Sequence, residues 1–89
     1  MNNEVKKVDF TGTIVKIGEY PKTKQDIFSN NFFYYVKVIQ PAIYKERIIL
    51  VTKLKHCFDF EFSIDDIING KFGVLNNDII NPIITGKIE

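Results

Sequence analysis

Phe33, Tyr35 and Lys37 occupy every second position in the most aromatic stretch of the chain. Aromatic rings stack on nucleobases and ammonium groups neutralise phosphates, and each stacked base contributes about 1–3 kcal/mol. The stretch 32–39 is rich in aromatic and β-branched residues, which favour a β-strand, and alternate side chains of a strand share one face. The spacing therefore predicts one face that carries two rings and an ammonium group, as a site for single-stranded nucleic acid would.

Further cations and rings lie in the neighbouring segments. A strand is predicted at 47–55, with the odd positions Arg47, Ile49 and Val51 on the same outer face. The long loop 20–31 and the turn 41–46 flank the two strands. The residues predicted to bind nucleic acid are Phe33, Tyr35, Lys37, Arg47, Lys53, Lys55, Tyr20, Lys22, Lys24, Tyr44 and Lys45.

The even positions of both strands are uncharged and are predicted to form the core. They are Phe32, Tyr34, Val36 and Val38 in the first strand, with Ile48, Leu50 and Leu54 in the second. An alternative is that Phe33 and Tyr35 pack beneath the long loop, with the lysines only solvating an edge. A shift of one residue in register would exchange the two faces.

Metal binding and catalysis are not expected from this sequence. The chain has one histidine and one cysteine, the neighbours His56 and Cys57, and adjacent strand residues point to opposite faces. A structural metal site needs several converging ligands, so we predict no metal and no cofactor. The chain also lacks a glycine-rich phosphate loop and a G-x-S-x-G motif, so we do not expect an enzyme.

The length of 89 residues predicts a single domain spanning 1–89. No apolar run approaches the ~20 residues that span a bilayer, and the first residues do not resemble a secretory signal. A lone cysteine allows no internal disulfide. Together these observations predict a cytoplasmic protein without membrane contact. The many isoleucines, lysines and asparagines suggest an AT-rich bacterial genome, a phage or another mobile element.

Charge is unevenly distributed although the formal net charge is only +1. Residues 1–58 contain ten Lys or Arg and five Asp or Glu, whereas residues 59–89 contain two and six. A local basic face matters more for nucleic-acid contact than the total charge does. The distribution is compatible with a basic face built by the first half, and equally with chance placement of solvated charges.

The predicted elements are strands at 8–19, 32–40, 47–55, 71–75 and 79–88, with a short helix at 63–69. Gly12 lies where the apolar positions of the first strand change parity, which predicts a bulge or a sharp bend. Ser63 and Asp66 resemble a helix capping box, and Ile64, Ile67 and Ile68 are spaced as an apolar helical stripe. The order is β-β-β-α-β-β.

This order, with a long bent first strand and a helix between strands 3 and 4, resembles the OB-fold family of single-stranded nucleic-acid-binding proteins. The resemblance covers nearly the whole chain and is topological, without a short motif. It implies a mainly β, five-stranded barrel whose strand 2–3 face binds single strands. The expected function is a small single-stranded nucleic-acid-binding protein, with DNA favoured over RNA. The alternative is a non-enzymatic protein-interaction module, a dimer or an inhibitor using the same face.

Overall fold

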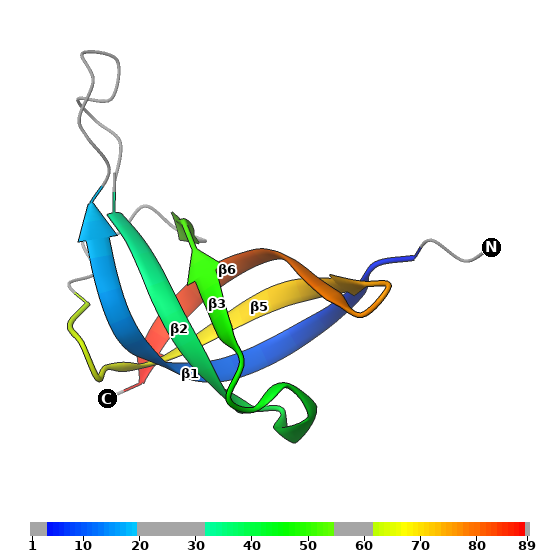
Figure 1. Cartoon of the computed structure of the whole chain (residues 1–89), viewed down its shortest axis with the longest axis horizontal. Coiled ribbons are helices and arrows are strands. Elements are labelled where there is room, and N and C mark those ends of the chain that lie inside the picture. The colour runs from blue at the N-terminus through cyan, green and yellow to red at the C-terminus, as the bar shows by residue number, and fades with distance from the viewer. Residues whose placement is uncertain (1–3, 20–31, 55–61, 89) are drawn as a thin grey trace, which may run out of the picture.

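The computed structural model describes residues 4–19, 32–54 and 62–88, with only the backbone of Lys53 and Leu54. These residues form one strongly curled, mainly antiparallel sheet that resembles half of a barrel (Figure 1). The elements are β1 (Lys6–Glu19), β2 (Phe32–Gln40), the 3₁₀ turn η1 (Ala42–Tyr44), β3 (Ile48–Val51), β4 (Lys53–Leu54), β5 (Ile67–Leu75) and β6 (Asp78–Ile88). The expectation of a mainly β protein is confirmed.

The strand order in the sheet is β3-β2-β1-β5-β6-β4. Each strand is antiparallel to its neighbour except at the pair formed by β4 and β6, which is parallel. Only Thr52 separates β3 from β4, although these two strands are at opposite ends of the order. The sheet is therefore curled far enough that one short stretch of chain forms one edge and then joins the other.

The curl begins in β1, which pairs with β5 and also with β2. Its register with β2 shifts between Thr11 and Gly12 and again between Ile14 and Lys16. Gly12 is buried against β2, and a Cβ atom there would overlap the side chain of Val36. The bend predicted near Gly12 is confirmed, and the second irregularity adds to it because bulges increase local twist.

The predicted helix at 63–69 is wrong, since these residues form a turn followed by the start of β5. The Ser63 amide donates to Asp66 Oδ2 (2.7 Å), and the Asp66 amide donates to the Ser63 carbonyl (3.1 Å). Asp65 has φ 74°, in the left-handed region that a right-handed helix excludes. One of the two contacts expected of a helix cap, from the Ser63 amide to the Asp66 carboxylate, is therefore present but closes a turn, and Ile67 and Ile68 alternate as strand residues.

The core lies inside the curl and is lined by β1, β2, β3, β5 and β6. Rings of Phe10 and Phe72 stack at its centre, with centroids 5.1 Å apart. The buried hydrophobic side chains are Phe10, Ile14, Tyr34, Val36, Val38, Ile49, Val51, Ile68, Phe72 and Ile84. The predicted core face of β2 is confirmed at three of its four positions, and the exception is Phe32, which lies at the strand end and is 42% exposed.

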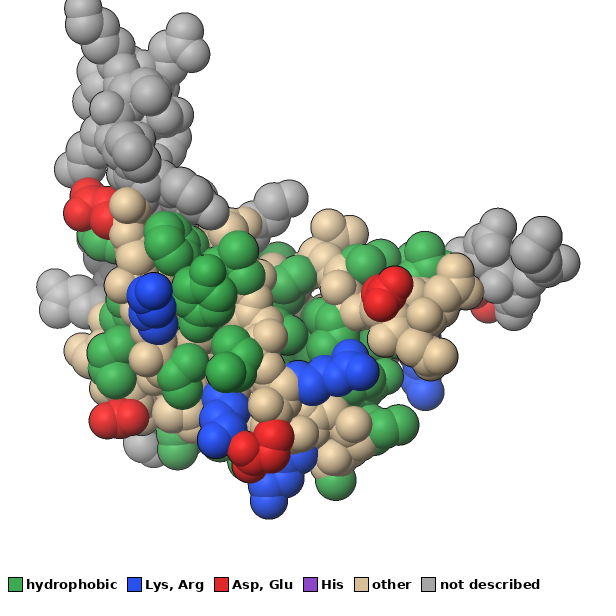
Figure 2. Space-filling view, in the orientation of Figure 1, with side chains coloured by type: hydrophobic (Ala, Val, Ile, Leu, Met, Phe, Trp, Pro, Cys, Tyr) green, Lys and Arg blue, Asp and Glu red, His purple; other side chains and the backbone are tan. Residues whose placement is uncertain are grey.

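The predicted faces of β3 are inverted in the structure. Ile49 and Val51 are buried, whereas Ile48 is 60% and Leu50 is 43% exposed. The register is set by a bulge in which the Glu46 amide donates to the Val38 carbonyl (2.9 Å) and the Val38 amide donates to the Arg47 carbonyl (2.8 Å). The extra residue decides which parity of β3 points inward. Hydrophobic side chains consequently gather on the outer surface over β2 and β3 (Figure 2).

Within the described ranges, no helix is long and apolar enough to span a bilayer.

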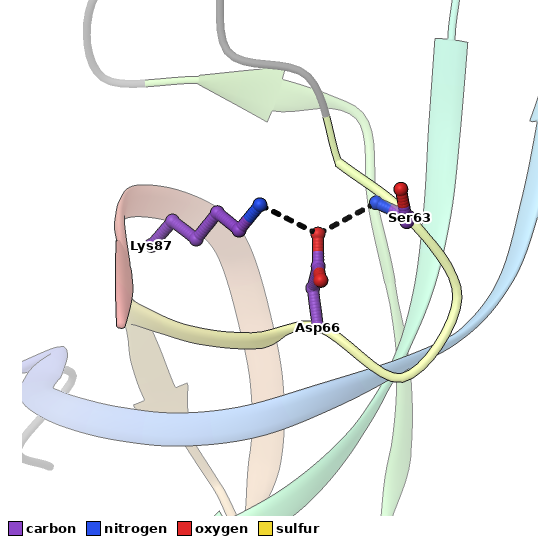
Figure 3. Close-up of polar contacts among 3 residues, drawn as sticks. All are labelled: Ser63, Asp66 and Lys87. Atoms are coloured by element: carbon purple, nitrogen blue, oxygen red, sulfur yellow. Dashed lines mark hydrogen bonds and ion pairs between the residues drawn. The ribbon is translucent and has the colours of Figure 1, made fainter. Parts of the chain in front are cut away.

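Ser63, Asp66 and Lys87 join the turn before β5 to the end of β6 (Figure 3). The Asp66 carboxylate accepts from the Ser63 amide and lies 3.1 Å from Lys87 Nζ, both through Oδ2. The hydrogen bond from Ser63 and the ammonium group of Lys87 lower the pKa of Asp66 below its ordinary value of 3.8. The charged carboxylate is therefore the form that the folded chain favours.

We expect Gly70→Ala to destabilise the fold by about 1–3 kcal/mol, because overpacking in a tight interior forces side chains and backbone to shift. A Cβ atom at Gly70 would overlap the Ile83 carbonyl and the Phe10 ring. Gly86→Ala is the matched control, since a Cβ atom there meets nothing within 4 Å. The control should be neutral or stabilise by about 0.4–1 kcal/mol through the unfolded chain. Urea unfolding of the three proteins measures both effects, and equal losses would contradict this packing.

We expect Asp66→Asn to lower the free energy of unfolding at neutral pH while keeping an acceptor for the Ser63 amide. A carboxyl group whose pKa is lowered on folding stabilises above its unfolded pKa, and that contribution is lost as pH falls through the folded pKa. The difference in unfolding free energy between wild type and variant should therefore become smaller as the pH falls below 3.8, the ordinary pKa of an aspartate. Urea midpoints across acidic pH measure it, with Asp78→Asn, at the first residue of β6, as the control. A difference that persists unchanged in acid would show that charge is not the cause.

Candidate nucleic-acid interface

Phe33, Tyr35 and Lys37 share the outer face of β2, opposite the buried face of Tyr34, Val36 and Val38. The rings of Phe33 and Tyr35 meet edge to face, with centroids 5.9 Å apart and an interplanar angle of 83°. Both residues are half-buried. The sequence-based placement of these three side chains on one outer face agrees with the structure, and two rings there lie in direct contact.

β1 supplies two residues that sequence reasoning missed. In the register of the two strands, Gly18 is opposite Phe33 and Lys16 is opposite Tyr35. A Cβ atom at Gly18 would overlap the Phe33 ring, so the absence of a side chain lets that ring lie against β1. Lys16 Nζ lies 5.6 Å from the centroid of the Tyr35 ring. Such exposed cation–π contacts contribute about 0.5–1 kcal/mol and hold the ammonium group beside the ring.

Lys16 reaches this face because of the irregular pairing between Ile14 and Lys16. Ile14 is buried, Val15 is 38% exposed and Lys16 is exposed, so the simple alternation of β1 ends at this point. The sequence signal was present in the change of apolar parity along β1. It was not enough to identify which residue after the bulge would face outward.

Lys37 forms an ion pair, with its Nζ 2.8 Å from Glu46 Oε2. A hydrogen bond from Lys37, together with its positive charge, lowers the pKa of Glu46. Any phosphate that approached Lys37 would compete with this carboxylate. Lys37 lies on the predicted face, but its ammonium group already has a carboxylate partner. The ammonium group of Lys16 lies beside an aromatic ring instead.

β3 extends the face with apolar side chains. Leu50 pairs with Tyr35, and Ile48 pairs with Lys37, so both point to the outer side of the sheet. Figure 2 shows the resulting cluster of hydrophobic side chains with Lys and Arg side chains around it. We call Lys16, Phe33, Tyr35, Ile48 and Leu50 the outer patch. It differs from the sequence prediction in β3, where Ile48 and Leu50 take the outward positions that were expected of Ile49 and Val51.

Tyr44 and Arg47 lie at the margin of this patch. The Tyr44 ring is edge-on to Phe72, with centroids 5.3 Å apart, and packs against the core. The Arg47 guanidinium lies 5.7 Å from the centroid of the Tyr44 ring. Core packing accounts for the position of Tyr44, so we leave it out of the outer patch.

Of the remaining predicted residues, two lie in the described part of the chain and are not members of the outer patch. Lys45 is exposed in the turn before β3. Lys53 belongs to β4, where its backbone pairs with Ile83. The predicted residues that lie outside the described residues are Tyr20, Lys22, Lys24 and Lys55.

Among the described residues, no three His, Cys, Asp or Glu side chains are grouped so as to hold a metal ion. His56 and Cys57 lie outside the described residues.

Comparison of the chain with protein-family models, with curated proteins and with solved structures found no match in any of the three. The function is therefore argued from the geometry of this chain alone.

Proposed function

We propose that this protein binds single-stranded nucleic acid, preferably DNA, on the outer patch of β1, β2 and β3. The observation that carries the proposal is the contact pair of Phe33 and Tyr35 on an outer face, with Lys16 beside the Tyr35 ring. Rings offer stacking surfaces to bases, and the neighbouring cation offers a partner to the phosphate between them. A duplex keeps its base faces stacked internally, so this chemistry favours single strands.

We further propose that the curled sheet is an OB-like barrel. Three features support this: β1 is long and bent, β1–β2–β3 is an antiparallel meander, and the chain after β3 pairs in parallel with β6. A short turn replaces the helix that was expected before β5. In folds of this kind the β2–β3 face and its loops hold single strands, which agrees with the position of the outer patch.

A second candidate function is protein docking through the same patch. The exposure of Ile48 (60%) and Leu50 (43%) favours it, because neighbouring exposed aliphatic side chains are typical of interaction surfaces. Ionic strength separates the two candidates. Phosphate contacts weaken steeply as salt rises, whereas apolar docking does not.

We expect Phe33→Ala and Tyr35→Ala each to weaken binding of a fluorescent oligothymidylate by about 1–3 kcal/mol, as the loss of a stacked base would. Ile43→Ala is the control, since Ile43 is the most exposed of the large hydrophobic residues described and lies in η1, outside the patch. Fluorescence anisotropy with single-stranded DNA, the matching RNA and a duplex gives the preference. Equal binding by the ring variants and the Ile43 variant would exclude stacking on these rings.

We expect Lys16→Ala to reduce the salt dependence of this binding by about one unit of slope if Lys16 contacts one phosphate. Lys71→Ala is the matched control, because Lys71 is an exposed strand lysine that lies near Asp9 (3.7 Å) rather than a ring. The measurement is the slope of log affinity against log salt concentration. A slope that Lys16→Ala leaves unchanged would place the phosphates elsewhere, and salt-insensitive binding by the wild type would favour protein docking.

A further inference from the structure

The curled sheet has an open seam between β3 and β6. β3 is at the end of the strand order and pairs with β2 only, so its other edge faces the first half of β6. A groove of about 420 Å³ separates them. Its lining residues are Arg47, Ile48, Ile49, Leu50, Ile79 and Pro82.

Asn81 and Pro82 explain why the seam stays open. The parallel pairing of β4 with β6 starts at Ile83, immediately after this dipeptide. Pro82 has no amide hydrogen to give to a ladder, and proline is confined to edge strands or irregular positions of sheets. Asn81 has φ 50°, which interrupts the extended backbone of β6. The ladder between the two edges therefore begins at Ile83 and does not extend toward Asp78.

The pairing of β2 with β3 shows which backbone groups face the seam. The Val38 amide donates to the Arg47 carbonyl (2.8 Å), and pairs in an antiparallel ladder alternate between bonded and non-bonded. Ile49 and Val51 are therefore the β3 residues that bond to β2. The amide and carbonyl groups of Ile48 and Leu50 point to the opposite edge. Within the described residues, no strand pairs with that edge.

We propose that the seam binds one extended peptide segment of a protein partner, which adds to β3 as a further strand and brings a carboxylate to Arg47. Unpaired strand edges are templates for an added strand, and main-chain hydrogen bonds provide the affinity. Ile79 and Pro82 give the groove an apolar wall. This site uses the edge of β3, whereas the proposed nucleic-acid site uses its outer face.

Arg47 indicates the charge of the partner segment. Its guanidinium lies 5.7 Å from the centroid of the Tyr44 ring, and Arg47 lines the groove. No carboxylate of the described residues lies within ion-pair distance of it. A guanidinium beside a ring, without a carboxylate partner in the described part of the chain, suits an acidic side chain or a terminal carboxylate of the bound segment.

A single strand fits this seam better than a second folded copy of the chain does. Pairing of β3 with β3 of another copy would bring its β2 along on the far side. Strands lie about 4.8 Å apart, so β2 of the second copy would lie about 10 Å from β3, on the side of the seam that β6 borders. A lone extended segment has no such second neighbour.

The test uses the whole chain and a soluble peptide, Glu-Val-Thr-Val-Thr-Val-Glu, blocked at both ends. In the free protein we expect fast amide hydrogen exchange at Ile48 and Leu50 and slow exchange at Ile49 and Val51. At about 1 mM peptide, exchange at Ile48 and Leu50 should slow at least about tenfold. Arg47→Ala should weaken binding about tenfold, as loss of one charge-assisted hydrogen bond would. Lys16→Ala should leave peptide binding unchanged.

Two control peptides define what would overturn the proposal. The first carries an N-methyl group on every valine and threonine, so these residues cannot donate to β3 from either edge. The second has both glutamates replaced by lysine. Binding of the methylated peptide as tight as that of the parent would exclude strand addition, and tight binding of the lysine peptide would exclude the role of Arg47.

Slow exchange at Ile48 and Leu50 in the free monomer would show an edge already paired, and slow exchange only in a concentration-dependent dimer would make a second copy the occupant. Absence of any effect of the parent peptide on these two amides would equally reject the proposal.

Discussion

The bend of β1 is the constraint on which the rest of the structure depends. β1 pairs with β5 over residues 6–13 and with β2 over residues 11–19, so its course decides how the two halves of the sheet meet. Gly12 allows Val36 to approach, and the irregularity after Ile14 adds a second change of register. The same irregularity places Lys16 beside the Tyr35 ring. The bent β1 thus helps to enclose the core on one side of the sheet and brings Lys16 to the outer patch on the other side.

Parts of this arrangement were predictable because local chemistry leaves little choice. β2 has rings and β-branched residues on one parity without any charge, and Tyr34, Val36 and Val38 are buried as that pattern requires. Asn76 and Asn77 both adopt positive φ in the hairpin between β5 and β6, where asparagine suits such a turn. Strong patterning and turn chemistry act over a few residues, so a single sequence can reveal them.

Other parts depend on contacts that the sequence does not display. β3 is apolar on both parities, so its inward face is decided by the bulge at Glu46. Glu46 adopts φ 76°, a conformation usually given to glycine at such bulges, and it also pairs with Lys37. The contact of the Ser63 amide with the Asp66 carboxylate occurs in this turn as it would in a helix cap, so the residues alone do not reveal that a strand follows and pairs with β1. The contribution of Lys16 likewise required knowledge of register.

The two proposed surfaces meet in β3, through different atoms of the same residues. The side chains of Ile48 and Leu50 extend the outer patch, while their backbone groups line the seam. Because the two proposed sites use different atoms of β3, side chains for one and backbone groups for the other, a ligand in one site does not by itself occupy the contacts of the other.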